Sequence, residues 1–519
     1  MMTEVDVVIV GGAFTGASAG LLLKRAHPEL RVLVVERSAE PDRKVGESTS
    51  EVAGCFLTRE LRLYDYLSQN HLVKHGLRLW FTEPENECFE RCGEVGPYYQ
   101  SRLPTFQLDR AKLDPHILEQ AVAAGCVLWQ PATVRSLKLG GRGNNLLEVR
   151  CGEETRQVRA NWVLDASGKA ALLARQRNTW RKLDEHPTNS IWVRYQGVKN
   201  LDSESLARRF PAYAAALPCP RHVATNHLMG RGWWCWIIPL KDGDVSAGIT
   251  WDPRLFELPS GPSLTARLTS HLLGHPVGRE LFHEATPIPQ DTRMYSHLPY
   301  YSTEVAGDGW IICGDAAGFM DPLYSQGLDY CSHGIMVAVE IIADDHRGRC
   351  TRQQVADFNR RFATSYFRWY RALYQDKYHY LGDMDLMWAA FLLDISTYFI
   401  GPARLVYDVG KPEWLYLPYH GKWGAAFAGF MAFYNRRLVH LAKKRWAAGV
   451  YGKNNLGRRL LLRQGFSPDW KMLRVLRQGV WQWLKAEAQG LFLPAPKTSH
   501  QTTGANAAAV TEPPVSPLQ

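Results

Sequence analysis

The sequence has ten cysteines but no Cys-x-x-Cys pair and no other spacing typical of metal ligands. This absence argues against a zinc ribbon or a thioredoxin-like redox motif. No apolar run reaches the roughly 18 to 20 residues that span a bilayer, because Asp394 and Arg404 interrupt the best candidate. Reduced core cysteines of a cytoplasmic protein are expected instead, since four of them lie in apolar surroundings: Cys55, Cys126, Cys235 and Cys313.

We expect neither a signal peptide nor a nucleic-acid-binding module. The first buried strand begins almost at the N-terminus, carries Asp6 and has no basic lead-in, so we expect no secretory signal. No segment fits a known nucleic-acid-binding module. The 519 residues, 46% hydrophobic and 22% charged, have an ordinary globular composition and are enough for two or three domains.

The N-terminus has the pattern of a dinucleotide-binding βαβ unit. Residues Val5 to Val10 predict a strand, Gly11-Gly12-Ala13-Phe14-Thr15-Gly16 opens a helix, and Val32 to Glu36 predict a second strand. Small residues let the backbone approach a pyrophosphate at the helix N-terminus, and Glu36 is placed to accept hydrogen bonds from a ribose. Ala13 stands where this pattern usually has its second glycine, which crowds the pyrophosphate slightly.

Two further loops repeat the pattern of a strand followed by small residues. Gly314 to Asp329 lies between the apolar run Trp310 to Cys313 and a predicted helix, and Asp315 suits a hydroxyl-rich group such as a ribityl chain. The third loop is Leu164-Asp165-Ala166-Ser167-Gly168. Three separated loops of this kind favour FAD over NAD alone.

With these motifs, the sequence resembles the flavin-dependent halogenases, a tryptophan-halogenase-like superfamily with the para-hydroxybenzoate hydroxylase-like FAD fold. The resemblance runs through most of residues 5 to about 345. Its most specific piece, Trp234-Cys235-Trp236-Ile237-Ile238-Pro239, fits the signature Trp-x-Trp-x-Ile-Pro. Lys44-Val45-Gly46-Glu47-Ser48-Thr49 and Gln107-Leu108-Asp109-Arg110 also match.

The resemblance implies an α/β fold: an FAD-binding Rossmann-like three-layer domain with an inserted antiparallel-sheet substrate domain and a C-terminal helical region. We expect the FAD-binding domain in residues 1–180 and 301–345, and the substrate domain in 181–300. A helical, aromatic and basic region should occupy 346–492, and 493–519 should be a disordered tail. The residue pattern also predicts helical structure in 50–70 and a small antiparallel ribbon beneath the flavin in 127–163. Residues 83–100 should be irregular, either a lid or substrate loop or a poorly ordered surface loop.

The resemblance also implies roles around the flavin. Lys44, Glu47 and Ser48 would belong to a loop that covers the flavin and communicates with the halide site, and Arg110 would contact FAD. Trp234 and Trp236 alternate along a predicted strand and share a face, which in most proteins is simply core packing. In the family they would form a wall between flavin and organic substrate, so that halide reacts first.

Halogenases use a lysine that holds hypohalous acid (HOX), or is modified by it, and delivers electrophilic halogen. Lys74 stands two residues before Gly76, which matches the Lys-x-Gly arrangement of the phenol and pyrrole enzymes. A solvated lysine at a strand start is the other interpretation of Lys74. Arg78 is the competing alignment, although a guanidinium does not readily form the same haloamine. A positive amine in a closed pocket could hold and aim HOX.

Tyr324 stands where tryptophan halogenases have a glutamate, which moves the sequence towards the phenol or pyrrole branch. Ser325, Gln326 and Gly327 would frame the halide through backbone N–H groups. Gln326 departs from the small residue usual there, and leaves open whether halide binding has been lost.

The C-terminal part is strongly basic. Residues 436–485 contain thirteen Lys or Arg and one acid, Asp469, with four tryptophans among them. This predicts a surface for an anionic partner, either a membrane face or an acidic acyl carrier protein; a solvated helical face is the third interpretation.

These features together predict an FAD-dependent halogenase of secondary metabolism, such as antibiotic biosynthesis. It would use FAD reduced by a separate flavin reductase, O2 and chloride or bromide to generate HOX. The substrate would be an electron-rich aromatic ring, a phenol or pyrrole, free or carrier-tethered. One alternative is an FAD-dependent monooxygenase or prenyl-type reductase of the same fold, and a second is a membrane-associated flavin redox sensor.

Overall fold

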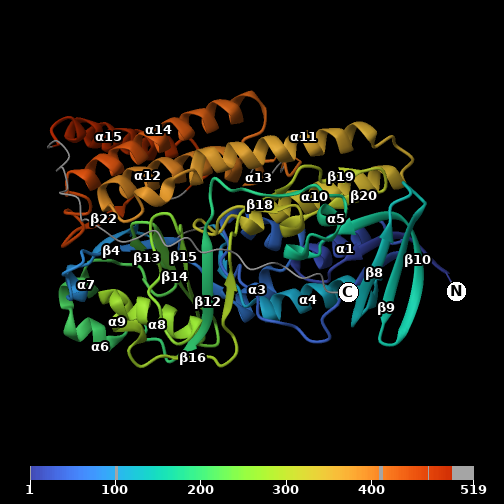
Figure 1. Ribbon diagram of the computed structural model, residues 1–519, viewed down its shortest axis with the longest axis horizontal. Helices are drawn as coiled ribbons and strands as arrows, with labels where there is room; N and C mark the ends of the chain where they lie inside the picture. Colours follow the sequence, from blue (N-terminus) through green and yellow to red (C-terminus); the bar gives the residue numbers. More distant parts are fainter. Residues whose placement is uncertain (1, 100–102, 408–412, 416, 466, 494–519) are drawn as a thin grey trace, which may run out of the picture.

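A computed structural model of the protein describes residues 2–99, 103–407, 413–415, 417–465 and 467–493. Apart from Leu493, the expected C-terminal tail lies outside the described residues. The chain forms two large sheets with a helical layer above them (Figure 1). This is the mixed α/β architecture that the sequence predicts.

The first sheet contains the predicted βαβ unit. Its parallel strands are β20 (Trp310–Ile312), β10 (Glu154–Asp165), β1 (Met2–Val10), β2 (Val32–Val35) and β7 (Val127–Trp129), in that spatial order. At one edge, β19 (Ala306–Gly307) pairs antiparallel with β20. Helix α1 (Phe14–Ala26) connects β1 to β2 and packs against α4 (Arg110–Ala123) and α10 (Gly327–His346).

The register of this sheet brings the three glycine-containing loops together. Val10 pairs with both Val35 and Asp165, and Asp165 pairs with Ile312. All four strands therefore end at one edge, where ligands of open α/β sheets bind. From the same sheet projects an antiparallel ribbon of β8 (Ala132–Lys138), β9 (Asn145–Cys151) and the start of β10, which confirms the ribbon expected in residues 127–163.

The second sheet has nine strands, mostly antiparallel. Their order is β16 (Thr286–Pro287), β12 (Asn189–Gln196), β15 (Val245–Trp251), β14 (Trp233–Pro239), β13 (Thr225–Gly230), β4 (Leu77–Phe81), β5 (Gly93–Pro97) and β22 (Arg459–Leu462), with β17 (Arg293–Tyr295) also paired to β12. Strands β4, β5 and β22 come from outside residues 181–300. The segment 83–100, expected to be an irregular loop, contributes the buried strand β5.

Alternation along β14 separates two cores. Trp234 and Trp236 face the large core shared with the first sheet and the helical layer. Cys235 and Ile237 face a smaller core on the side of α8 (Leu264–Gly274) and α9 (Pro276–Phe282). The shared face predicted for the two tryptophans is therefore confirmed.

Smaller elements connect these layers. Residues 50–70, expected to be helical, contain α2 (Glu51–Cys55) and α3 (Tyr64–Asn70). A two-stranded sheet pairs β3 (Leu72–Val73) with β6 (Phe106–Gln107), and a three-stranded sheet joins β11 (Trp180–Lys182), β18 (Tyr300–Ser302) and β21 (Gly318–Phe319). All ten cysteines lie in the described part of the chain and are free, and the four expected in the core are buried.

Long helices dominate beyond residue 346, as expected. They are α11 (Arg352–Trp369), α12 (Met384–Tyr398), α14 (Gly421–Ala447) and α15 (Met472–Leu491), and they form the layer along the top of Figure 1. Within the described residues, Met384–Tyr407 is long and apolar enough to cross a membrane by length and composition, with a mean hydropathy of 1.3. The expectation that no such run exists was wrong, but 89% of its window is buried inside the fold, which is typical of a core helix.

Candidate active site

The glycine loop after β1 is shaped for close backbone approach. Gly11 has φ +107°, and a Cβ there would lie 2.5 Å from the Ala166 carbonyl oxygen. A Cβ on Gly16 would lie 1.9 Å from the Gly11 carbonyl oxygen, so a side chain at either position would force the loop apart. Ala13 is the N-cap of α1 and supplies no side-chain hydrogen bond to the first turn, which leaves that turn suited to a phosphate.

Charged residues surround this edge of the sheet. Glu36 follows β2 and accepts a hydrogen bond from the Gly12 backbone N–H (2.6 Å). Asp315 lies in the turn after β20, and burial raises the pKa of its carboxyl group. These are the glycine turn, helix N-terminus and carboxylates that a dinucleotide such as FAD requires, so the residues fit the cofactor that the sequence predicts.

Arg110 opens α4 beside this edge. Its guanidinium donates to both carboxylate oxygens of Asp114 (2.6 and 2.9 Å) and lies 5.5 Å from the centroid of the Phe14 ring. The Lys44 ammonium lies 3.6 Å from the same Asp114 carboxylate. Arg110 and Lys44 therefore meet at one acid next to α1.

The loop at residues 44–49 is tethered on both sides. Buried Glu47 accepts a hydrogen bond from Arg194 on β12, and Arg194 also donates to Asp109, the N-cap of α4 (2.7 Å). Burial raises the pKa of Glu47 to about 7. The Ser48 hydroxyl lies 2.8 Å from the Thr225 hydroxyl on β13. The loop thus joins the first sheet to the second.

Lys74 lies at the end of β3, next to this loop. Only 4% of its surface is exposed, so it is not a solvated lysine, and its ammonium donates to the Thr49 carbonyl oxygen (2.6 Å). Burial lowers the pKa of Lys74 to about 8, opposed by the carboxylates of Glu51 and Asp329. Lys74 lines a cavity of about 70 Å³ together with Ser50, Glu51, Gly76, Leu77, Tyr324, Gln326, Leu373, Phe391, Asp394, Ile395, Tyr398 and Phe399.

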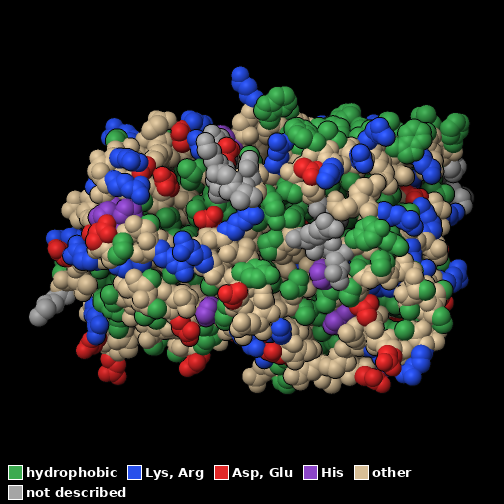
Figure 2. Space-filling view, turned by 180° about the vertical axis from the view of Figure 1, so that it is seen from behind, with side chains coloured by type: hydrophobic (Ala, Val, Ile, Leu, Met, Phe, Trp, Pro, Cys, Tyr) green, Lys and Arg blue, Asp and Glu red, His purple; other side chains and the backbone are tan. Residues whose placement is uncertain are grey.

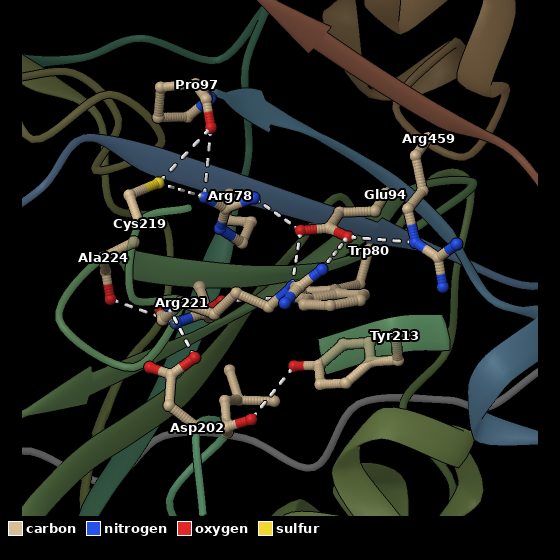
Figure 3. A network of polar contacts seen from close by, with 12 residues as sticks. Arg78, Trp80, Glu94, Pro97, Asp202, Tyr213, Cys219, Arg221, Ala224 and Arg459 are labelled. Atoms are coloured by element: carbon tan, nitrogen blue, oxygen red, sulfur yellow. Dashed lines mark hydrogen bonds and ion pairs between the residues drawn. The ribbon is translucent and has the colours of Figure 1, made fainter. Parts of the chain in front are cut away.

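Arg78, the competing candidate, lies in a different environment. It is fully buried and ion-paired to Glu94, which also accepts a hydrogen bond from Arg221 (3.0 Å). The Arg78 guanidinium donates in addition to the Pro97 carbonyl oxygen (3.1 Å). Figure 3 shows these side chains pointing toward one another in one network of polar contacts. Arg78 therefore holds β4 and β5 together and is not among the residues that line the Lys74 cavity.

The start of α10 stands between two cavities. Gln326 precedes the first helical residue, Gly327, and lines both the Lys74 cavity and a smaller cavity of about 20 Å³ next to Gly314. Its side-chain carbonyl accepts a hydrogen bond from the Tyr374 hydroxyl (2.9 Å). Ser325 has φ +58°, the left-handed conformation found in turns that expose N–H groups. An anion is favoured at such a helix N-terminus.

A carboxylate reaches the cavity from the helical layer. Tyr324 donates a hydrogen bond to Asp394 on α12 (2.7 Å), and buried Lys377 donates to the same oxygen (2.7 Å). An acid is therefore present beside Tyr324, although the sequence has none at that position. Sequence reasoning missed Glu51 and Asp394 as cavity residues, because nothing in the local pattern signals that they converge.

Trp234 and Trp236 lie side by side, with ring centroids 5.7 Å apart. The Trp234 indole N–H donates to the Tyr378 hydroxyl (2.9 Å), which donates to Asp321 in the loop after β20 (2.8 Å). Trp236 packs on Gly248, where a Cβ would meet its ring at 2.3 Å. Trp234 therefore connects the second sheet to that loop through Tyr378. Neither tryptophan ring lines either of the two cavities.

Comparison with known proteins identifies the family of this chain. The tryptophan halogenase family matches residues 85–388. Flavin-dependent halogenase chlA of Dictyostelium discoideum is 26% identical over 444 residues, which cover 77% of this chain and 70% of that protein. The 1H-pyrrole-2-carbonyl-[peptidyl-carrier protein] chlorinase of Pseudomonas fluorescens is 23% identical over 354 residues, which cover 64% and 75%.

Among solved structures, halogenase PltM in complex with phloroglucinol and FAD has a TM-score of 0.71 at 18% identity, covering 93% of this chain and 96% of that one. This similarity shows the fold. Neither the monooxygenase or prenyl-type reductase alternative nor the redox-sensor alternative gains support from these relatives. The family match covers more than half of the sequence. The chain therefore belongs to the tryptophan halogenase family of FAD-dependent enzymes.

Proposed function

We propose that this protein is an FAD-dependent halogenase that replaces a hydrogen of an electron-rich aromatic ring, a phenol or pyrrole, with chlorine or bromine. The observation that carries the proposal is the position of Lys74: a buried amine with a pKa of about 8, in a largely apolar cavity whose wall includes Gln326 at the start of α10. When bound and reduced, FAD supplies the electrons for the reaction with O2 that converts halide to HOX.

The residues that would hold FAD surround the carboxyl edge of the first sheet. They are Gly11, Gly12, Ala13, Phe14, Thr15, Gly16, Glu36, Lys44, Glu47, Ser48, Arg110 and Asp315. Backbone N–H groups of Ser325, Gln326 and Gly327 would hold the halide, because the positive end of the α10 dipole lies there. Trp234, packed against Trp236, would fix the loop after β20 through Tyr378, and the two tryptophans would so keep organic substrate on the Lys74 side.

Lys74 would hold and aim HOX inside the cavity. Its ammonium donates a hydrogen bond to the oxygen of HOX, which makes the halogen more electrophilic. The ring carbon takes the halogen, the HOX oxygen takes a proton from the Lys74 ammonium and leaves as water, and the ring proton is lost. Glu51, half-buried on the same cavity wall with a pKa raised by burial, is placed to accept that proton.

The cavity favours an aromatic ring with a hydrogen-bond donor. Its wall combines apolar side chains, among them Leu77, Leu373 and Phe391, with the carboxylates of Glu51 and Asp394. A phenol O–H or pyrrole N–H satisfies an acceptor there. A substrate tethered to a carrier protein is supported by the chlorinase relative, whose name specifies one. A separate flavin reductase would reduce FAD, and the ten free cysteines suit the reducing cytoplasm.

Mass spectrometry of products tests this function. Purified protein is supplied with FAD, a flavin reductase, NADH, O2 and free or carrier-linked phenols and pyrroles, in chloride or bromide. We expect products with the halogen isotope pattern, lost in Lys74→Ala while flavin oxidation persists, and retained in Lys112→Ala, which removes an exposed lysine. Products that gain oxygen whatever the halide would refute the halogenase and leave a monooxygenase.

A further inference from the structure

Helix α15 carries an apolar stripe on its outward face. Its inward face is closely packed: a Cβ on Gly479 would lie 2.9 Å from the Leu393 side chain of α12. A helix of this kind normally turns polar residues outward. The outward positions nevertheless include Leu473, Trp481, Leu484 and Leu491, of which Trp481 is 66% and Leu491 79% exposed.

The stripe extends onto the neighbouring helix. Phe433 of α14 is half exposed, and its ring meets Trp483 of α15 edge-on, with centroids 5.7 Å apart. Phe492, directly after α15, is 87% exposed. Figure 2 shows hydrophobic side chains gathering with Lys and Arg along the upper right of the molecule, where α14 and α15 lie when Figure 1 is turned by 180°. This surface is here called the α15 face and comprises Phe433, Leu473, Trp481, Leu484, Leu491 and Phe492.

The charge around the α15 face is mostly positive. Arg474, Arg477 and Lys485 are exposed on α15 itself, and Lys443 and Lys444 are exposed at the end of α14. The nearby acid Glu487 is neutralised by a two-pronged ion pair with Arg437 (2.8 and 2.7 Å). Such an excess of exposed bases over acids attracts an anionic partner.

Tryptophan and leucine beside arginine and lysine are the composition of helices that lie in a membrane interface. The amphipathic indole ring is favoured at the level of the lipid headgroups, while basic side chains are attracted to the phosphates of anionic lipids. We propose that the α15 face docks on the surface of an anionic lipid bilayer, with α15 lying in the plane of the interface. Leu473, Trp481 and Leu484 then enter the headgroup region, and Arg474 and Arg477 contact phosphates.

The combination of exposed apolar and basic side chains favours a lipid surface over a carrier protein. The bases would attract an acidic carrier as well, but the exposed large apolar side chains run along α15 from Leu473 to Leu491, as in a helix that lies in a membrane interface. A bilayer uses both features at once. The docking is peripheral, because the long apolar segment Met384–Tyr407 is buried in the core.

Vesicle co-sedimentation of the full-length protein tests the docking. The probes are vesicles of phosphatidylcholine with phosphatidylglycerol, and of phosphatidylcholine alone. We expect sedimentation with the first and at least about tenfold weaker binding to the second, with loss of binding at high salt. The double variant W481S/L484S should lose binding, and R474E/R477E should weaken it by at least about tenfold.

Matched variants elsewhere keep the test specific. Tyr64→Ser removes an exposed aromatic ring on α3, and Lys138→Glu reverses an exposed charge on β8; both should bind like the wild type. Absence of wild-type binding to anionic vesicles, or equal binding by W481S/L484S, would overturn the proposal. Two other results would also overturn it. In the first, the protein binds an acidic acyl carrier protein through Trp481 but binds no vesicle. In the second, sedimentation velocity shows a dimer that W481S/L484S dissociates.

Discussion

Replacing Lys74 by methionine should abolish halogenation and stabilise the fold at the same time. Lysine is nearly isosteric with methionine along its stem, but burial disfavours its ammonium and lowers the Lys74 pKa from 10.5 to about 8. That pKa difference corresponds to about 3 kcal/mol of folding stability, which the protonated Lys74 costs the protein below pH 8. Loss of the hydrogen bond to Thr49 offsets about 1 kcal/mol of this gain in stability. The free energy of unfolding of Lys74→Met should therefore exceed that of the wild type by about 2 kcal/mol near pH 7.

The pH dependence gives this prediction its sign. Between pH 8 and 10.5 the unfolded chain binds a proton at Lys74 that the folded chain does not, so wild-type stability rises with pH across this window. The advantage of Lys74→Met should therefore be full below pH 8 and vanish above 10.5. Asp329, whose pKa burial raises to about 7, can take up a proton near neutral pH when the neighbouring cation is removed.

Urea unfolding at pH 7 and at pH 10 measures this effect. Lys112→Met removes an exposed, ion-paired lysine, and its stability relative to the wild type should not change with pH in this way. The reasoning is refuted if Lys74→Met is less stable than the wild type at pH 7, or if its advantage is the same at both pH values. The first outcome would mean that Glu51 and Asp329 compensate the desolvation of the ammonium fully, and the second would mean that the gain does not come from protonation of Lys74.

Three further changes test other parts of the molecule. Glu94→Gln leaves two buried arginines facing a neutral amide, and urea unfolding should show a loss of about 3 kcal/mol. Gly16→Ala places a Cβ against the Gly11 carbonyl, so the protein should emerge from gel filtration without flavin absorbance, whereas Gly274→Ala, with open space around it, should keep FAD. Glu51→Gln should retain FAD but lower the rate constant of the halogenation step by at least about tenfold, as measured by product formation under single-turnover conditions.

The sequence predicted well those features that depend on the local geometry of the chain. The strand, glycine loop and helix at Val5 to Gly16 follow from backbone geometry and period, and the structure places them as expected. Strand β5 was missed because it is stabilised by pairing between distant segments: Val95 pairs with Leu460 and with Leu79. Its sequence, Gly-Glu-Val-Gly-Pro, has no strand character of its own.

The candidate site likewise contains residues that the local sequence predicts and residues that it does not. Lys74 could be selected from its spacing to Gly76, but its burial depends on the pairing of β3 with β6 and on contact with Thr49. In the sequence, Asp394 only interrupts an apolar run. The structure gives it hydrogen bonds from Tyr324 and from the Tyr434 hydroxyl (2.6 Å), which no pattern along the chain encodes.

Helix α12 connects the two proposals made for this protein. One side of it lines the Lys74 cavity through Phe391, Asp394 and Ile395, residues that lie beyond the segment matched by the family. Another side packs against Gly479 of α15, so the cavity and the α15 face are separated by the thickness of this helix layer. Because Trp481 lies on the exposed side of α15 and does not line the cavity, changes at Trp481 should alter where the enzyme resides and leave turnover of a soluble phenol unchanged. Changes at Phe391 should instead alter which rings the cavity accepts.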